Sequence, residues 1–268
     1  MPPLKLIIVV IICLLANDSI KAQEADSSKT CISASSAIFS PVSGQRIARK
    51  NNFCIKSWLV PGCFIAYGIA SLGNISLQNF NVEMKEEVYL ENPHKKIPID
   101  NYLQYTPAAV VYGLNALGLK AKHGFVDRTG IYLISNIILS TTVLSVKKLS
   151  HELRPDGSNF SSFPSGHTAE AFASAEFLRE EYNDISPWYG IAGYGMAAAT
   201  GFLRMYNNKH WIGDVVAGAG VGIASTRIAY WLYPKIQHRL FKNKPVNTVF
   251  IPTYENRTIS VGLIHRFT

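Results

Sequence analysis

Five apolar segments place the strongest limit on what this chain can fold into. Four of them are 15 to 18 residues long, just short of the roughly 20 residues that a membrane-spanning helix needs. The fifth is longer but contains Asp214 and Arg227. The pattern therefore predicts a helical bundle. The segment lengths alone leave open whether that bundle is embedded in a membrane or is soluble. The segments are Trp58–Leu72, Tyr102–Leu119, Ile131–Val146, Trp188–Leu203 and Trp211–Leu232.

A sixth segment, Thr168–Tyr182, is rich in Ala and Glu and favours a helix. Strand-like alternation occurs only near the end, in Thr258–Phe267. We therefore predict an all-α fold, a bundle of about six helices embedded in a membrane, with a short β-like C-terminal tail. The helical domain is expected over 57–240, after a polar lead-in at 23–56 and before a tail at 241–268.

The distribution of charge favours a membrane protein and argues against a nucleic-acid partner. The chain has 26 basic and 18 acidic residues, and charged residues make up only 16% of it. No cluster of basic residues with interleaved aromatics is present, so we expect no nucleic-acid partner. Basic residues gather between the second and third apolar segments and after the last one, which predicts that both regions are cytoplasmic. In the last segment, Gly218 and Gly222 have the spacing that lets two helices approach closely, in lipid or in a soluble bundle.

The N-terminus has the features of a secretory signal. Lys5 precedes an apolar run, Leu6–Ala16, and a polar stretch follows it. We expect residues 1–22 to be a signal peptide, with a retained anchor as the alternative. In an oxidising compartment Cys31 and Cys54 could form a disulfide, whereas Cys63 is expected to be buried.

Three polar blocks lie at the ends of the apolar segments, at 147–155, 163–168 and 204–214. Together they contain Lys147, Arg154 and Arg204, two histidines, a carboxylate and a Ser-Gly turn at a helix start. Arg presents forked donors that match phosphate oxygens, and Lys adds a compact positive charge. This set of side chains predicts a site for a tetrahedral dianion.

The same blocks offer a nucleophile and an acid. His210 and Asp214 are four residues apart, so on a helix the carboxylate can hold one ring nitrogen and leave the other free to attack. His167 would then protonate the leaving oxygen. Ser165 and Gly166 open a helix whose free N–H groups can bind an anion.

The blocks resemble the motifs of the type 2 phosphatidic acid phosphatase superfamily, which shares its site with class A acid phosphatases and vanadium haloperoxidases. The family pattern is Lys-x6-Arg-Pro, then Pro-Ser-Gly-His, then Ser-Arg-x5-His-x3-Asp. Ten positions agree in order and spacing, and Leu203 replaces the serine often found before the arginine. The matching positions are Lys147, Arg154 and Pro155, then Pro164, Ser165, Gly166 and His167, then Arg204, His210 and Asp214.

The resemblance implies a metal-independent phosphatase, with no cofactor, that acts through a phosphohistidine. It assigns His210, His167 and Asp214 to catalysis. The phosphate would be bound by Lys147, Arg154, Ser165, Gly166 and Arg204.

The expected substrate is a lipid phosphate or diphosphate of the undecaprenyl diphosphate, lipid A phosphate or phosphatidic acid type. The expected location is the inner membrane, with the site facing the periplasm. The alternatives are a soluble periplasmic nonspecific acid phosphatase, a vanadium haloperoxidase, and a membrane scaffold that retains an inactive site.

Overall fold

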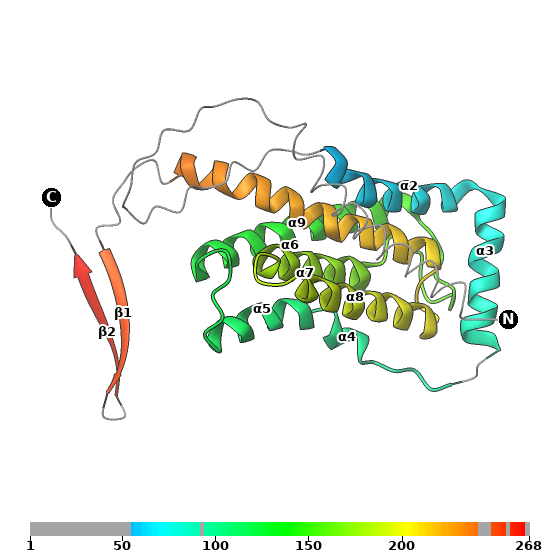
Figure 1. Cartoon of the computed structure of the whole chain (residues 1–268). Coiled ribbons are helices and arrows are strands. Elements are labelled where there is room, and N and C mark those ends of the chain that lie inside the picture. Colours follow the sequence, from blue (N-terminus) through cyan, green and yellow to red (C-terminus); the bar gives the residue numbers. More distant parts are fainter. Residues whose placement is uncertain (1–54, 92–93, 241–247, 256–257, 266–268) are drawn as a thin grey trace.

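The computed structural model describes residues 55–91, 94–240, 248–255 and 258–265, and Figure 1 shows their arrangement. The predicted signal peptide, the polar lead-in and the Cys31–Cys54 disulfide lie outside the described residues. Within the described part, the bundle is entirely helical. Its α-helices are α2 (Leu59–Gly73), α3 (Ile75–Lys85), α4 (Asp100–Leu103), α5 (Thr106–Ala116), α6 (Phe125–Ser150), α7 (Gly166–Tyr182), α8 (Trp188–Tyr206) and α9 (Ile212–Leu240).

Six of these helices, α2 and α5 to α9, match the predicted apolar or helix-forming segments. The second segment differs, because the chain turns at Tyr105 and starts α5 at Thr106 with Pro107 in its first turn. Proline is favoured there because it lacks the N–H that a helix start leaves unused. The earlier part of that segment joins the short helix α4. After the bundle, β1 (Thr248–Glu255) and β2 (Thr258–His265) pair as an antiparallel hairpin beyond the end of α9 (Figure 1).

Helix α3 was not predicted, and it changes the direction of the chain. The axis bends by 95° between α2 and the helical stretch from Ile75 to Leu90, which continues from α3 through a π-helical turn, Glu86–Leu90. The side chain of Asn74 caps α3 by accepting a hydrogen bond from the Leu77 N–H at 3.2 Å. Helix α3 therefore lies across one end of the bundle (Figure 1).

Helix α9 lies between α7 and α2 and packs closely on both. A Cβ atom added to Gly218 would meet the Ser165 carbonyl oxygen at 2.5 Å, and one added to Gly222 would clash with the α7 backbone at Ala169. The predicted close approach at these two glycines is confirmed. Only glycine lets the helix axes come this near.

Contacts between α2 and α9 fix the direction of α2. Gly68, near the end of α2, lies against Ala217 near the start of α9, whereas Pro61 lies against Gly220. The two helices are therefore antiparallel. Helix α2 ends, and α9 begins, at the same end of the bundle.

The outer faces of the bundle are apolar. Two helices, α6 and α9, are long and apolar enough to cross a membrane, and a third span results if α2 and the helix after its bend count as one. On α6, Leu133, Ile137 and Leu144 are each about 60% exposed (58%, 62% and 60%). Exposed apolar faces of this kind are typical of helices that contact lipid.

One burial prediction was wrong. Cys63 is exposed, because it lies on the apolar outer face of α2. Arg128, one of the basic residues between the second and third apolar segments, is only 1% exposed, with its guanidinium against the rings of Tyr112 and Phe125 and bonded to Asn115 at 2.6 Å.

Candidate active site

The eight residues predicted to form the site all belong to helix ends, or to loops beside them, at one end of the bundle, which we call the site end. Each helix supplies its residues at the end where the chain enters or leaves it. Lys147 lies in the last turn of α6 and Arg154 in the loop after it; Ser165, Gly166 and His167 open α7; Arg204 lies in the last turn of α8; His210 precedes α9 and Asp214 lies in its first turn.

His210 and Asp214 form the predicted pair. The ring Nδ1 of His210 lies 3.2 Å from Asp214 Oδ2, and the two residues are 3% and 1% exposed. Because an ionised carboxylate only accepts, Nδ1 carries the proton and Nε2 is left with a free lone pair. Burial lowers the pKa of His210 to about 4, an effect that the charges of Arg204 and Lys147 reinforce and Asp214 opposes. The imidazole is therefore neutral at neutral pH, as a nucleophile must be.

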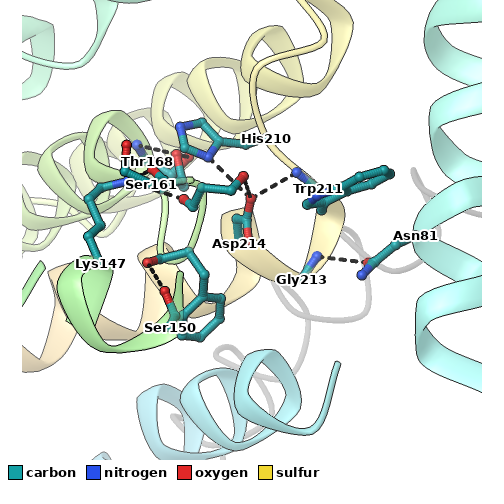
Figure 2. A network of polar contacts seen from close by, with 12 residues as sticks. Asn81, Lys147, Ser150, Ser161, Thr168, His210, Trp211, Gly213 and Asp214 are labelled. Atoms are coloured by element: carbon teal, nitrogen blue, oxygen red, sulfur yellow. Dashed lines mark hydrogen bonds and ion pairs between the residues drawn. The ribbon is translucent and has the colours of Figure 1, made fainter. Parts of the chain in front are cut away.

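Asp214 is held by several donors besides the histidine. Its Oδ2 accepts from Ser162 Oγ at 2.5 Å and from the Trp211 N–H at 3.0 Å. The Ser165 N–H donates to the Asp214 backbone carbonyl at 3.0 Å, which ties the start of α7 to the first turn of α9. Figure 2 shows His210 and Trp211 converging on this carboxylate.

The three cations surround the histidines. Lys147 Nζ donates to the carbonyl oxygens of Ser161 and Ser162 at 2.6 and 3.1 Å. The Nε atoms of Arg154 and Arg204 are buried without a hydrogen-bond partner among the described residues. A buried guanidinium N–H without a partner is costly, and an oxyanion between the two arginines would satisfy both.

The start of α7 has the geometry of an anion-binding helix end. Ser165 is the N-cap, and its Oγ accepts from the Thr168 N–H at 3.4 Å. A Cβ at Gly166 would meet only Val143 Cγ1, at 3.7 Å, so packing within the protein does not require glycine there. The role of Gly166 in letting a ligand approach stays a prediction.

Glu152, which sequence reasoning missed, adds a second carboxyl group beside Asp214. Glu152 Oε2 and Asp214 Oδ1 are both buried without a hydrogen-bond donor among the described residues, and the two side chains interact. Burial, together with the contact and charge of Asp214, raises the pKa of Glu152 to about 9. At neutral pH Glu152 is therefore a neutral acid, and its single proton satisfies both oxygens.

The short helix α4 also reaches the site and was not predicted to do so. Asp100 Oδ2 accepts from Arg204 Nη1 at 2.6 Å, and Asn101 Oδ1 lies 2.9 Å from His167 Nε2. Both residues lie far from the three motifs in the sequence, which is why spacing alone gave no sign of them.

Helix α3 supports the loop that carries His210. Asn81 Oδ1 accepts from the Gly213 N–H at 3.2 Å, an otherwise free donor in the first turn of α9 (Figure 2). Lys85 Nζ donates to the Pro155 carbonyl at 2.9 Å and lies 5.5 Å from the centre of the Trp211 ring. The bend after α2 therefore buttresses two of the three motifs.

Two further residues of the first motif region face away from this chemistry. His151 is exposed and ends α6 in a left-handed conformation, with φ of 45°. Asp156 is bonded to Lys209 at 2.6 Å. Within the described residues, no group of three His, Cys, Asp or Glu side chains could hold a metal ion.

A protein-family model described as the PAP2 superfamily matches residues 129–238, which contain all three motifs and all eight predicted site residues. The chain belongs to the PAP2 superfamily.

Curated relatives extend this match beyond the motifs. A lipid A 1-phosphatase of Porphyromonas gingivalis is 34% identical over 209 residues, which are 76% of this chain and 44% of that protein. The bacitracin transport permease protein BcrC of Bacillus licheniformis is 33% identical over 105 residues, 39% of this chain and 47% of that protein. A lipid A 1-phosphatase of Helicobacter pylori is 29% identical over 108 residues, 36% of this chain and 55% of that protein. The chain thus spans about half the length of these relatives. A solved structure, Aquifex aeolicus LpxE, is 21% identical with a TM-score of 0.45, covering 57% of this chain and 95% of that one.

Proposed function

We propose that this protein is a metal-independent phosphatase that hydrolyses a lipid phosphate or diphosphate through a phosphohistidine. One observation carries the proposal: a neutral, buried His210, fixed by Asp214, lies in one site with two buried arginine Nε donors that have no partner among the described residues. A phosphoryl group is the ligand that matches both the nucleophile and the donors.

In the first step, His210 Nε2 attacks phosphorus while the bond from phosphorus to the leaving oxygen breaks. Asp214 stabilises the positive charge that develops on the imidazole. The cations bind the non-bridging oxygens, and His167 gives its proton to the leaving oxygen.

In the second step, the neutral His167 takes a proton from water, whose oxygen attacks the phosphohistidine. The phosphorus–nitrogen bond breaks and the electron pair returns to His210. Inorganic phosphate leaves, and both histidines are restored to their starting protonation states.

The surroundings of the site favour a lipid substrate at a membrane surface. Large apolar side chains are exposed on the loops and helix ends at the site end, with Tyr102 at 77%, Leu149 at 83% and Phe160 at 62%. Such a collar suits acyl chains or the membrane interface better than a small soluble phosphate. The names of two relatives put lipid A first among the candidates, followed by undecaprenyl diphosphate and phosphatidic acid.

The decisive experiment measures phosphate release by the purified protein from these lipids in micelles and from p-nitrophenyl phosphate. We expect lipids to be preferred by kcat/KM, and His210→Ala to abolish turnover while the protein stays folded. His238→Ala is the matched control, because His238 is exposed at the opposite end of the bundle. Equal or faster turnover of p-nitrophenyl phosphate would refute lipid specificity, and an active His210→Ala variant would refute the mechanism.

A soluble acid phosphatase is the second candidate, because in the part of the chain that the structure describes only two single helices pass as membrane spans by length and composition. Washing membranes with carbonate separates the two. Retention of the protein supports the membrane enzyme, and release without detergent supports the soluble one.

A further inference from the structure

Two adjacent residues outside the family motifs contact two of the residues that the motifs supply. We propose that Asp100 and Asn101 are positioning residues: Asp100 orients Arg204 toward the phosphoryl oxygens, and Asn101 orients His167 toward the leaving oxygen. This inference rests on the proposed function, since it assigns partners to two side chains of that mechanism.

The contact between Asp100 and Arg204 is short and buried. The carboxylate oxygen Oδ2 lies 2.6 Å from Arg204 Nη1, and the two residues are 1% and 7% exposed. The contact engages one terminal nitrogen of the guanidinium, whereas Nε, on its other edge, has no partner within the described ranges. Because the guanidinium is planar and rigid, fixing one nitrogen fixes the direction of the rest. Asp100 therefore aims the unpaired edge of Arg204.

Asn101 acts on the other catalytic group. Its Oδ1 lies 2.9 Å from His167 Nε2. An amide oxygen can only accept, so it selects the ring form in which Nε2 carries a hydrogen. Since a protonated imidazole has two N–H donors, Nδ1 is left to protonate the leaving oxygen. Asn101 thus fixes both the orientation of the ring and the nitrogen that it uses.

The segment that carries this pair is fastened to the end of α8. Ile97 exchanges two hydrogen bonds with the side chain of Asn207, its N–H donating to Oδ1 at 2.9 Å and its carbonyl accepting from Nδ2 at 2.8 Å. His94 stacks on Tyr206, with ring centres 3.4 Å apart, and its Nε2 lies 2.7 Å from the Tyr206 carbonyl. These contacts lie within three residues of Arg204. The segment before α4 is therefore held in register with the arginine that Asp100 contacts.

Substitutions of Asp100 and of Asn101 should change the kinetics in different ways. In the proposed mechanism Arg204 binds the phosphoryl oxygens of any substrate, so loss of its orientation should weaken the binding of all substrates alike. A general acid matters when the leaving group is a strongly basic alkoxide, and much less when it is a weakly basic nitrophenolate. The loss of kcat when Asn101 is substituted should therefore depend on the leaving group. A general loss of folding would not produce that dependence.

The experiment measures kcat and KM for phosphatidic acid in micelles and for p-nitrophenyl phosphate. Asn101→Ala is expected to lower kcat for phosphatidic acid on the order of 10-fold, which is part of the rate enhancement that a general acid contributes. The kcat for p-nitrophenyl phosphate should change by about twofold or less. Asn101→Asp, which keeps the acceptor oxygen, should recover most of the lost kcat. Asp100→Asn should raise KM for both substrates on the order of 10-fold.

Ile99→Val is the matched control just before the same helix, because the Ile99 side chain is 53% exposed and the change keeps it apolar. Equal losses on both substrates with Asn101→Ala, or no recovery with Asn101→Asp, would overturn the role of Asn101. Unchanged KM with Asp100→Asn would overturn the role of Asp100. A wild-type protein inactive on both substrates would instead overturn the proposed function, and this inference with it.

Discussion

At the scale of single residues, burial of His210 gives the site its pH dependence. Because burial lowers the pKa of His210 to about 4, the nucleophile is neutral over the whole neutral range. We predict that kcat/KM for p-nitrophenyl phosphate, whose leaving group needs little help from a general acid, is flat toward acid until the pH approaches this value and then falls as the imidazole is protonated. For a lipid substrate kcat/KM should instead rise toward that pH, because burial and the nearby cations lower the pKa of the proposed acid, His167, to about 4 as well. The pH profile of kcat/KM for p-nitrophenyl phosphate measures this limb, because that ratio reports the free enzyme.

Asp214 provides a check on the sign of this effect. The carboxylate favours the charged imidazole, so Asp214→Asn should move the acid limb to lower pH while it reduces kcat on the order of 10³-fold. An acid limb near pH 6.5, the value of an ordinary histidine, would contradict a buried nucleophile.

Glu152 predicts a second limb, on the alkaline side. Its pKa of about 9 means that it is protonated at neutral pH and loses its proton as the pH rises through that value. Two neighbouring carboxylates would then repel each other, and Asp214 would lose the donor to its Oδ1. Asp214 and Lys147 are the charged groups that act on Glu152, with opposite effects.

Two variants test this interpretation. Glu152→Gln, whose amide donates without titrating, should keep near wild-type activity at pH 7 and lose the alkaline limb near 9. Glu152→Ala should lower kcat on the order of 10-fold at every pH. If the glutamine variant is as impaired as the alanine variant, a hydrogen bond donated by residue 152 to Asp214 is not required for activity.

At the scale of the elements, the spacing of α9 against α7 depends on the absence of side chains. We predict that Gly222→Ala lowers the melting temperature in detergent, because overpacking costs about 1–3 kcal/mol and outweighs the gain of up to about 1 kcal/mol from alanine in a helix. Gly195→Ala is the matched control, since a Cβ there meets nothing within 4 Å and should leave stability unchanged or raise it. A melting temperature unaffected by Gly222→Ala would show that the helices can separate without cost.

Elements also show which parts of the fold the sequence could predict. The six helices α2 and α5 to α9 were predictable because each contains an apolar or helix-forming run, and α7 also has a boundary signal in Ser165. Helix α3 was missed because its apolar residues are few, although Phe80, Met84 and Val88 recur every four residues and pack together. Its cap, Asn74, was visible as well. The pattern was present but too sparse to stand out beside the apolar segments.

The site shows the same division. The motif residues were predictable because their types and spacing are specific to phosphoryl chemistry. Asp100 and Asn101 were not, because they contact residues 104 and 66 positions away, and only the folded chain brings them together. Glu152 lies inside a motif gap, where spacing rules assign no residue type.

At the scale of the whole molecule, both ends of the bundle carry exposed basic side chains, and those at the site end include Lys95, Lys96 and Lys148. The end opposite the site carries basic side chains that include Lys120, Lys122, Lys235 and Arg239. Lys122 marks this end, because its N–H donates to the Glu181 carbonyl at the end of α7. Because the basic residues before α6 and at the end of α9 lie at this end, we propose from the positive-inside rule that it faces the cytoplasm and that the site end faces outward.

This orientation bears on the expected signal peptide. Helix α2 runs antiparallel to α9, so the chain enters α2 away from the site end, where the Ser57 carbonyl accepts from Arg227 about halfway along α9. If α2 crosses the membrane, its start therefore lies on the side that we propose is cytoplasmic. Cleavage after residue 22 would leave the new N-terminus outside, and the polar stretch at 23–56 has no apolar run to bring it back. We therefore predict that residues 1–22 are retained. The intact mass of the purified protein shows directly whether residues 1–22 are present. Labelling of cells with a membrane-impermeant maleimide is the control for orientation. A cysteine introduced by Lys95→Cys at the site end should react from outside, and one introduced by Lys122→Cys should not. Loss of residues 1–22 together with this labelling pattern would show that α2 does not cross the membrane.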